Sequence, residues 1–178
     1  MSNILQNQSD IYCLKEETIN ILKQNALSSP NKRSRLCLHH ARSHLTHEMI
    51  IVFHEKTIVP VHRHPVSRSE SYHVIEGSMK VFFFDEDGNP TNYIILDSYP
   101  NSNPIFYRLS SHTWHLPIPT SEFMVYHECL TGPFEKNSDI EYPKWSCRYN
   151  SRDKIKSLLM SNVAQHLSLI HISEPTRP

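Results

Sequence analysis

Two histidines placed two residues apart, His62 and His64, are the side chains whose type and spacing point most directly to chemistry. Residues i and i+2 of a β-strand face the same side, so an extended segment here would aim both imidazoles at one point. Glu70 follows a few residues later, and His115 lies about fifty residues downstream. Histidine nitrogens with one carboxylate suit a divalent transition-metal ion such as Fe, Mn, Ni or Zn. These four residues are therefore the predicted ligands of one metal ion.

Short β-strands are the elements expected to position these ligands. Pro60 and Pro65 bracket the histidine pair and limit the strand that carries it. Glu70 opens a second β-like run that stops at Gly77, where a tight turn is expected. An H-x-H pair alone is weak evidence in a chain with 13 histidines. The metal interpretation therefore depends on several strands converging on one interior point.

The remaining pattern predicts a mainly β protein with a helix at each end. An apolar stripe within 14–27 predicts an N-terminal helix, and residues 151–160 predict a second one. Short runs rich in β-branched and aromatic residues indicate a sandwich or barrel between them. These runs are 49–54, 57–62, 71–75, 80–84, 92–96, 105–109 and 123–130. We expect a helical segment over 1–30, one β-domain over 31–145 and a helical extension over 146–166.

The ligand pattern resembles the two metal-binding motifs of the cupin family. His62, His64, Glu70 and Gly77 follow the order of the first motif, and His115 matches the histidine of the second. The gap before the glutamate is one residue longer than usual, and the usual P-x-G before the second motif's histidine is missing. The resemblance implies a single cupin domain, a double-stranded β-helix or jelly-roll barrel.

These departures point to a narrower resemblance, to WbuC-type cupin-fold metalloproteins found among O-antigen polysaccharide biosynthesis genes. The matching segments are R-x-R-L-C-L-H at 33–39, the run from 62 to 77, V-F-F-F-D-E-D-G at 81–88, F-Y-R-L at 106–109, W-H-L-P-I at 114–118 and H-E-C-L-T-G-P-F at 127–134. This resemblance implies a metal-dependent protein acting on a sugar or sugar nucleotide. Analogy with other cupins implies a homodimer.

Further residues are candidates for the site, each with a plainer alternative. If Glu70 points inward, alternation also points Tyr72 inward, as a pocket hydroxyl or as core packing, and sends His73 outward. Glu128 is a candidate acid/base group or an ordinary barrel carboxylate. Guanidinium groups recognise phosphate and carboxylate, although solvated surface is the commoner role of a single arginine. The candidate substrate contacts of this kind are Arg33, Arg35 and Arg108.

Two classes of function remain open at this point. The first is a metal-dependent enzyme acting on a small polar molecule by isomerisation, epimerisation or oxygen-dependent oxidation. The second is a non-catalytic metal-containing module that binds a sugar-like ligand. A structural barrel stabilised by a closed zinc site is a third interpretation. A usable acid/base group beside the metal would favour the enzyme.

Bulk properties exclude several other classes. Eighteen basic and eighteen acidic residues cancel, which argues against a general binder of nucleic acid or anionic membranes. The first residues lack a basic region followed by an apolar core, and no apolar run approaches the ~20 residues of a membrane span, so we expect a cytoplasmic protein. Residues 167–178 include L-S-L-I-H-I-S-E-P-T-R, which reads like a translated sequencing adapter. We expect this tail to be no part of the native fold.

Overall fold

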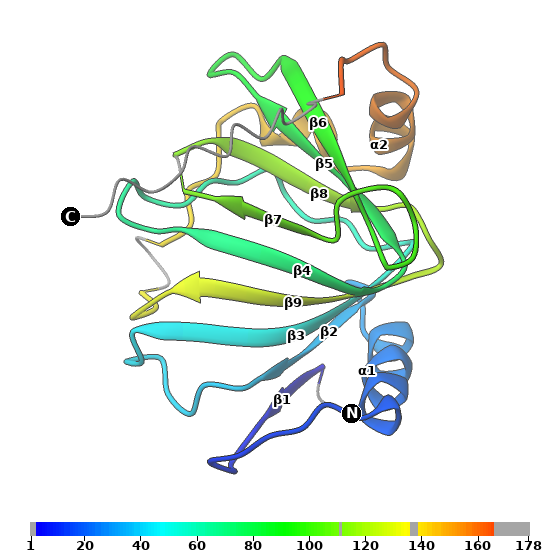
Figure 1. The fold of residues 1–178 in the computed structure, drawn as a ribbon. Helices are drawn as coiled ribbons and strands as arrows, with labels where there is room; N and C mark the ends of the chain where they lie inside the picture. Colours follow the sequence, from blue (N-terminus) through cyan, green and yellow to red (C-terminus); the bar gives the residue numbers. More distant parts are fainter. Residues whose placement is uncertain (1–2, 111, 136–138, 166–178) are drawn as a thin grey trace, which may run out of the picture.

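The computed structural model describes residues 3–110, 112–135 and 139–165, and within them the chain forms two facing β-sheets (Figure 1). In spatial order, the six-stranded sheet contains β1 (Ile4–Gln6), β2 (Arg33–Cys37), β3 (Thr46–His54), β9 (Phe123–Thr131), β4 (Glu70–Glu76) and β7 (Phe106–Leu109). The three-stranded sheet contains β6 (Pro90–Asp97), β5 (Ser78–Phe84) and β8 (Trp114–Pro119). All the described pairings between strands are antiparallel except that of β1 with β2.

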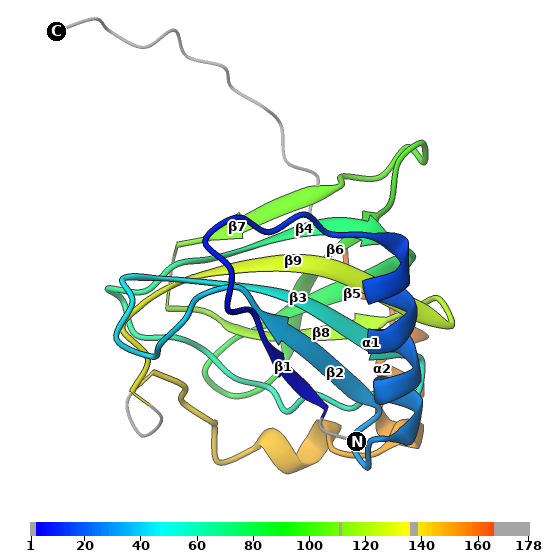
Figure 2. The ribbon, with the colours of Figure 1, turned by 90° about the horizontal axis from the view of Figure 1, so that it is seen from below.

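Helix α1 (Glu16–Ser28) covers the outer face of the six-stranded sheet, beside β2 and β3 (Figure 2). Leu27 of the predicted apolar stripe is exposed, whereas Leu22 of the stripe and Ala26 are fully buried. They share a cluster with every second residue of the strands beneath: Leu36, Ile50, Val52 and Val125. This outer cluster fixes the helix on the sheet.

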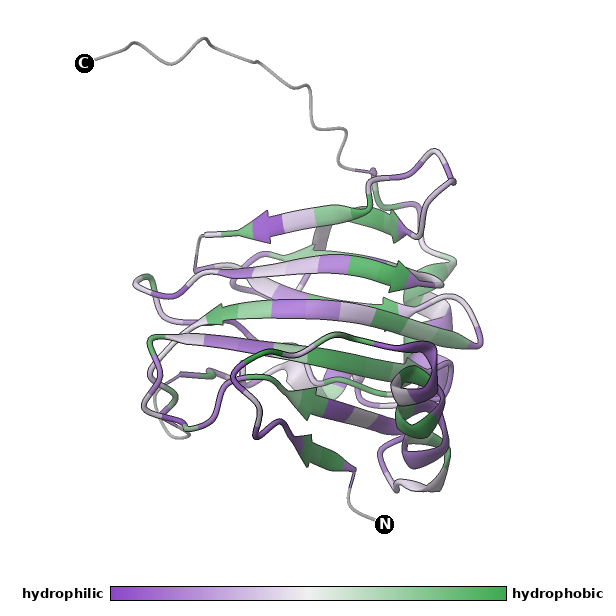
Figure 3. Ribbon diagram, turned by 60° about the horizontal axis from the view of Figure 1, so that its bottom comes forward, coloured by the Kyte–Doolittle hydropathy of each residue, from purple (hydrophilic) through white to green (hydrophobic). Residues whose placement is uncertain are grey.

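The main core lies between the two sheets. Met79, Val81, Leu116 and Met124 are fully buried there. The short segments η1 (Ser146–Tyr149) and α2 (Arg152–Leu159) follow the strands, and α2 adds Ile155 and Leu158 to the same core. Hydrophilic and hydrophobic residues are interspersed along the strands (Figure 3), as expected where alternate side chains face different surroundings.

The predicted fold class is confirmed: the protein is mainly β, with two sheets in a cupin-like sandwich, an N-terminal helix and a C-terminal helix. No helix in the described ranges is long and apolar enough to span a bilayer. The adapter-like residues 167–178 lie outside these ranges.

The strand predicted over 57–62 is wrong, and β8 was not among the predicted strands. The segment before β4 is extended but carries only isolated bridges, from His62 to His115 and from Arg63 to Glu141. β8 contains Pro117 and ends at Pro119, which mask it in the sequence. β8 lies at the edge of the three-stranded sheet and pairs with β5 alone among its strands. A proline in an edge strand can lack its N–H without breaking the hydrogen-bond ladder.

Candidate metal centre

The three predicted histidine ligands lie close together in space. His62 and His64 come from the extended segment before β4, and His115 comes from β8. One ring nitrogen of each lies within 4.8 Å of those of the other two. Reciprocal backbone hydrogen bonds join His62 to His115, at 3.1 and 2.9 Å. The structure therefore forms a three-histidine cluster that can hold a metal ion.

Each of the three imidazoles is fixed by a backbone carbonyl in the same way. A carbonyl oxygen only accepts hydrogen bonds, so each Nδ1 must carry a hydrogen, and in the neutral ring Nε2 is the atom that keeps the lone pair. Metal-binding histidines are commonly oriented by such contacts. The Nδ1–oxygen distances are 2.9 Å from His62 to Pro60, 2.7 Å from His64 to Asp139 and 3.0 Å from His115 to Thr113.

Glu70, the predicted fourth ligand, is buried beside the histidines. Its Oε1 lies 2.9 Å from His115 Nε2, and its Oε2 lies 3.4 Å from His64 Nε2. The hydroxyls of Tyr72 and Tyr107 also donate to the two carboxylate oxygens, at 3.0 and 2.8 Å. Burial raises the pKa of Glu70, but the charges and hydrogen bonds of the histidines lower it well below its usual value. Glu70 is therefore held as a carboxylate.

One buried atom tests whether these residues fit a metal. His115 Nε2 is inaccessible and has no hydrogen-bond partner of good geometry among the residues that the structure describes. In the neutral ring its lone pair would face a Glu70 oxygen at 2.9 Å, and the two acceptors would repel each other unless a proton or a metal ion lies between them. Two ligands bound at about 2.1 Å and at right angles around one ion would be about 3 Å apart. A shared cation removes the repulsion and matches this spacing, so the residues fit a divalent metal ion.

The two histidines of the extended segment differ in their proton affinity. Burial, with the neighbouring positive charge of His115, lowers the pKa of His62 to about 3. Burial also lowers the pKa of His64, but hydrogen bonding and attraction to Glu70 outweigh it and raise the pKa overall. At neutral pH His62 is therefore a ready ligand, whereas His64 holds its proton more tightly and must release it when a cation binds.

Arg63 lies between the two histidines in the sequence, and its side-chain contacts fix the extended segment before β4. Its guanidinium lies 3.9 Å from the ring centroid of Trp114, the residue before His115. It also pairs with Glu86 and Glu141, both at 2.8 Å. These contacts tie the extended segment to β8 and to the turn after β5.

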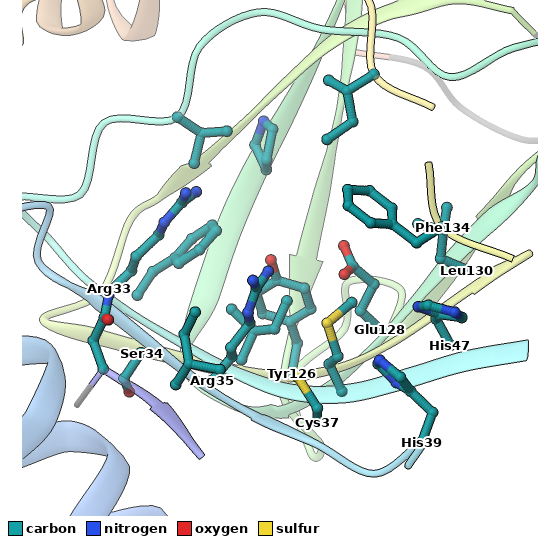
Figure 4. A pocket seen from close by; sticks show the side chains of 18 of the residues that line it. Arg33, Ser34, Arg35, Cys37, His39, His47, Tyr126, Glu128, Leu130 and Phe134 are labelled. Atoms are coloured by element: carbon teal, nitrogen blue, oxygen red, sulfur yellow. The ribbon is translucent and has the colours of Figure 1, made fainter. Parts of the chain in front are cut away.

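A cavity of about 590 Å³ adjoins the cluster and is lined by His62 and His64. Glu128, on β9, points into it (Figure 4). No hydrogen bond to its carboxylate occurs among the described residues. Burial and the negative charge of Glu70 raise the pKa of Glu128 to about 7. A carboxyl group with this pKa can exchange a proton near neutral pH.

The other candidates divide between the cavity and the surface. Tyr72 lines the cavity and His73 is exposed, as strand alternation predicts. Arg33 and Arg35 also line the cavity, whereas the Arg108 guanidinium donates to Ser69 Oγ at 3.0 Å outside it. The roles of all these residues stay predictions.

Some neighbours of the site were not included in the predicted ligand shell. Tyr107 holds Glu70 from β7, where it pairs with Tyr72 across the strands. The sequence showed that Tyr107 lies on a β-like run, but it did not show that this run pairs with β4. His39 and His47 stack at 3.9 Å between ring centroids at the wall of the cavity.

Comparison with known proteins defines the fold more firmly than the family. A family model described as a domain of unknown function (DUF6016) matches residues 14–96, which include His62, His64 and Glu70 but not His115. The chain matches no curated protein sequence.

Solved structures resemble the chain at low sequence identity. A Shewanella oneidensis structural-genomics target is 9% identical, with 78% of this chain and 90% of that one covered and a TM-score of 0.53. CapF bound to the inhibitor 3-isopropenyl-tropolone is 12% identical over 65% of this chain and 33% of its own length, with a TM-score of 0.51.

A Vibrio cholerae transcriptional regulator of the HTH_3 family is 20% identical, with 57% and 52% covered and a TM-score of 0.42. The chain thus spans about half of that regulator and a third of CapF. At these identities the two structures with TM-scores above 0.5 establish the fold alone. The structural neighbours are cupin-fold proteins, and this chain has the cupin fold.

Proposed function

We propose that this chain is a metalloprotein that binds one divalent transition-metal ion through His62, His64, His115 and Glu70, and acts on a small, sugar-like molecule. The observation that carries the proposal is the cluster of three histidines, whose ring nitrogens lie within 4.8 Å of one another and, at His115 Nε2, 2.9 Å from a buried Glu70 oxygen. Fe, Mn, Ni and Zn all suit three imidazoles and one carboxylate.

A bound ion would act as a Lewis acid that polarises a substrate oxygen or lowers the pKa of bound water. The protein's own side chains and backbone supply the remaining functions of the site. The backbone carbonyls keep the Nε2 atoms directed inward, and the Tyr72 and Tyr107 hydroxyls hold the Glu70 carboxylate. Glu128, with a pKa of about 7, supplies a group that can take or return a proton at the substrate.

Glu128 also favours an enzyme over a binding module. A module that only holds a ligand needs no group titrating near neutral pH beside the metal, whereas isomerisation and epimerisation move protons. The cavity beside the histidines likewise favours a metal with room for a substrate over a closed structural site. The sugar-like substrate, and a place in polysaccharide biosynthesis, are supported by the resemblance to WbuC-type proteins.

Cobalt substitution of the full chain tests for an open metal site. The visible spectrum of bound Co²⁺ reports its coordination, and azide is a small anion that occupies open positions. We expect the spectrum to change on addition of azide. An intense tetrahedral spectrum that azide leaves unchanged would indicate a closed structural site and contradict the proposal.

Two histidine variants make the cobalt experiment specific. His62→Ala removes a cluster ligand and should abolish the cobalt spectrum. His73→Ala, on an exposed residue of β4, is the matched control and should keep it. Equal spectra from both variants would place the cobalt elsewhere in this histidine-rich chain.

A further inference from the structure

β2 places two arginines on the cavity side of the six-stranded sheet. Arg33 and Arg35 alternate with Ser34 and Leu36, which are buried towards α1. Both arginines line the cavity, and Figure 4 shows them on the strand beside the hollow that Glu128 and Tyr126 also border. The alternation of β2 thus sends its guanidinium groups to the opposite side of the sheet from the helix.

Neither guanidinium has a partner in the described part of the chain. Arg63 and Arg68 each form ion pairs at 2.8 Å with acidic residues, whereas no described ion pair or hydrogen bond involves the guanidinium group of Arg33 or Arg35. Guanidinium groups at the wall of a cavity keep all their donors available for a ligand. Their planar fork matches carboxylate and phosphate oxygens.

The charge of the cavity favours an anion. Arg33, Arg35 and Arg42 line it, and among the described lining residues Glu128 is the single acidic side chain. Glu128 is partly protonated near neutral pH, because its pKa is raised to about 7. The cavity is therefore positive even before a metal ion is counted, in a chain whose formal net charge is zero. Such a local excess attracts anionic ligands.

The arginines lie away from the metal cluster, across the sheet. Arg35 pairs with Ile51, which pairs with Tyr126, which pairs with Val74 of β4. Arg35 is thus three strands from the strand that carries Glu70, or about 14 Å at the usual spacing. A ligand that reaches both ends needs an extended carbon skeleton. Met49, Ile51 and Phe53 form an apolar wall between the two ends.

We propose that Arg33 and Arg35 form an anion subsite, so that the ligand of the cavity is an acidic small molecule. It presents hydroxyl or carbonyl oxygens at the histidine end and a carboxylate or phosphate at the arginine end. This inference deepens the proposed function and depends on it for the role of the histidine end. The arginine end has its own test, because it needs no metal.

Nuclear magnetic resonance of the arginine Nε–H groups tests the subsite directly. The ¹⁵N-labelled full chain is titrated with inorganic phosphate, D-glucuronate and neutral D-glucose, without metal and with Zn²⁺. We expect the Arg33 and Arg35 signals to shift saturably with an anion, with a dissociation constant in the millimolar range, and not with glucose. A response to phosphate or to glucuronate alone identifies the anionic group.

Charge-neutralising variants separate the subsite from general charge. Arg35→Gln should weaken binding of the responding anion by about tenfold. Arg152→Gln, on the exposed first residue of α2 away from the cavity, should change it less than twofold. Equal losses in both variants, or no saturable shift with either anion, would overturn the anion subsite. Absence of bound Zn²⁺ in the same samples would instead count against the proposed metal site, so the two failures are distinguishable.

Discussion

The two faces of the six-stranded sheet use alternate residues of the same strands for opposite purposes. The outer face, under α1, is an apolar cluster containing Leu36 and Val52. The inner face carries Glu70, Glu128 and Arg35 among its apolar residues. Burying an apolar side chain contributes about 1.5–3 kcal/mol, whereas burying a charged group costs free energy unless it is paired. The outer face therefore serves stability alone, whereas the inner face combines the main core with groups that can do chemistry.

The largest effect is expected from His115→Ala on the inner face. Loss of one imidazole should lower metal affinity by more than about 100-fold, since even neighbours that only orient ligands contribute 10–100-fold. Competition with a chelator measures the affinity. His73→Ala, on an exposed histidine, should leave the affinity unchanged. A similar loss in both variants would show that the inner cluster is not the metal site.

Leu22→Ala on the outer face should affect stability alone. Leu22 is fully buried, so its truncation should lower the free energy of unfolding by about 3 kcal/mol. Denaturant unfolding measures this change. Metal stoichiometry of the folded variant should match that of the wild type. Loss of metal without loss of stability would contradict the separate roles of the two faces of the sheet.

Glu128→Gln should raise stability, with a defined pH dependence. The pKa of Glu128 is about 7 in the folded chain and has its ordinary value of 4.5 in the unfolded chain. As pH rises, the unfolded chain therefore loses this proton at a lower pH than the folded chain does. The wild type thus loses stability as pH rises through this window, and the glutamine variant does not. Above pH 7 the metal-free variant should be more stable by about 1–2 kcal/mol, after allowance for solvent screening.

The same glutamine variant has internal controls in pH and metal. Below pH 4.5 the stability difference should vanish, because both folded and unfolded wild type are then protonated at Glu128. Bound metal should reduce the difference, since a nearby cation lowers the pKa of the carboxyl group. A pH-independent difference would mean that Glu128 titrates normally.

The smallest effect is expected from Tyr107→Phe. The Tyr107 hydroxyl donates to Glu70 Oε1 at 2.8 Å, so its removal should lower metal affinity by about tenfold. The chelator competition used for His115→Ala measures it. Tyr93→Phe on β6 removes a hydroxyl from a half-buried tyrosine away from Glu70 and should have no effect.

The sequence predicted the three-histidine cluster better than the elements that carry it. The spacing of His62 and His64 and their order before Glu70 are local properties of the chain. The conformation of 57–62 is not local, because its bridges depend on β8 and on Glu141. β8 in turn is hidden by Pro117, which a border strand tolerates.

The chemistry around the ligands depends on contacts between distant segments. The pKa of Glu128 follows from burial and from Glu70, which the β4–β9 pairing brings near. Tyr107 reaches Glu70 only through the pairing of β7 with β4. Alternation correctly placed Tyr72 inside and His73 outside, because that property needs only one strand.

Elemental analysis of the full chain, purified without a histidine tag, tests the central claim most directly. We predict about one Fe, Mn, Ni or Zn per wild-type chain and almost none in the His62→Ala variant, because one ion needs the whole histidine cluster. No metal in the wild type, even after reconstitution, would contradict the metal site. The same metal content in wild type and variant would contradict its assignment to these histidines.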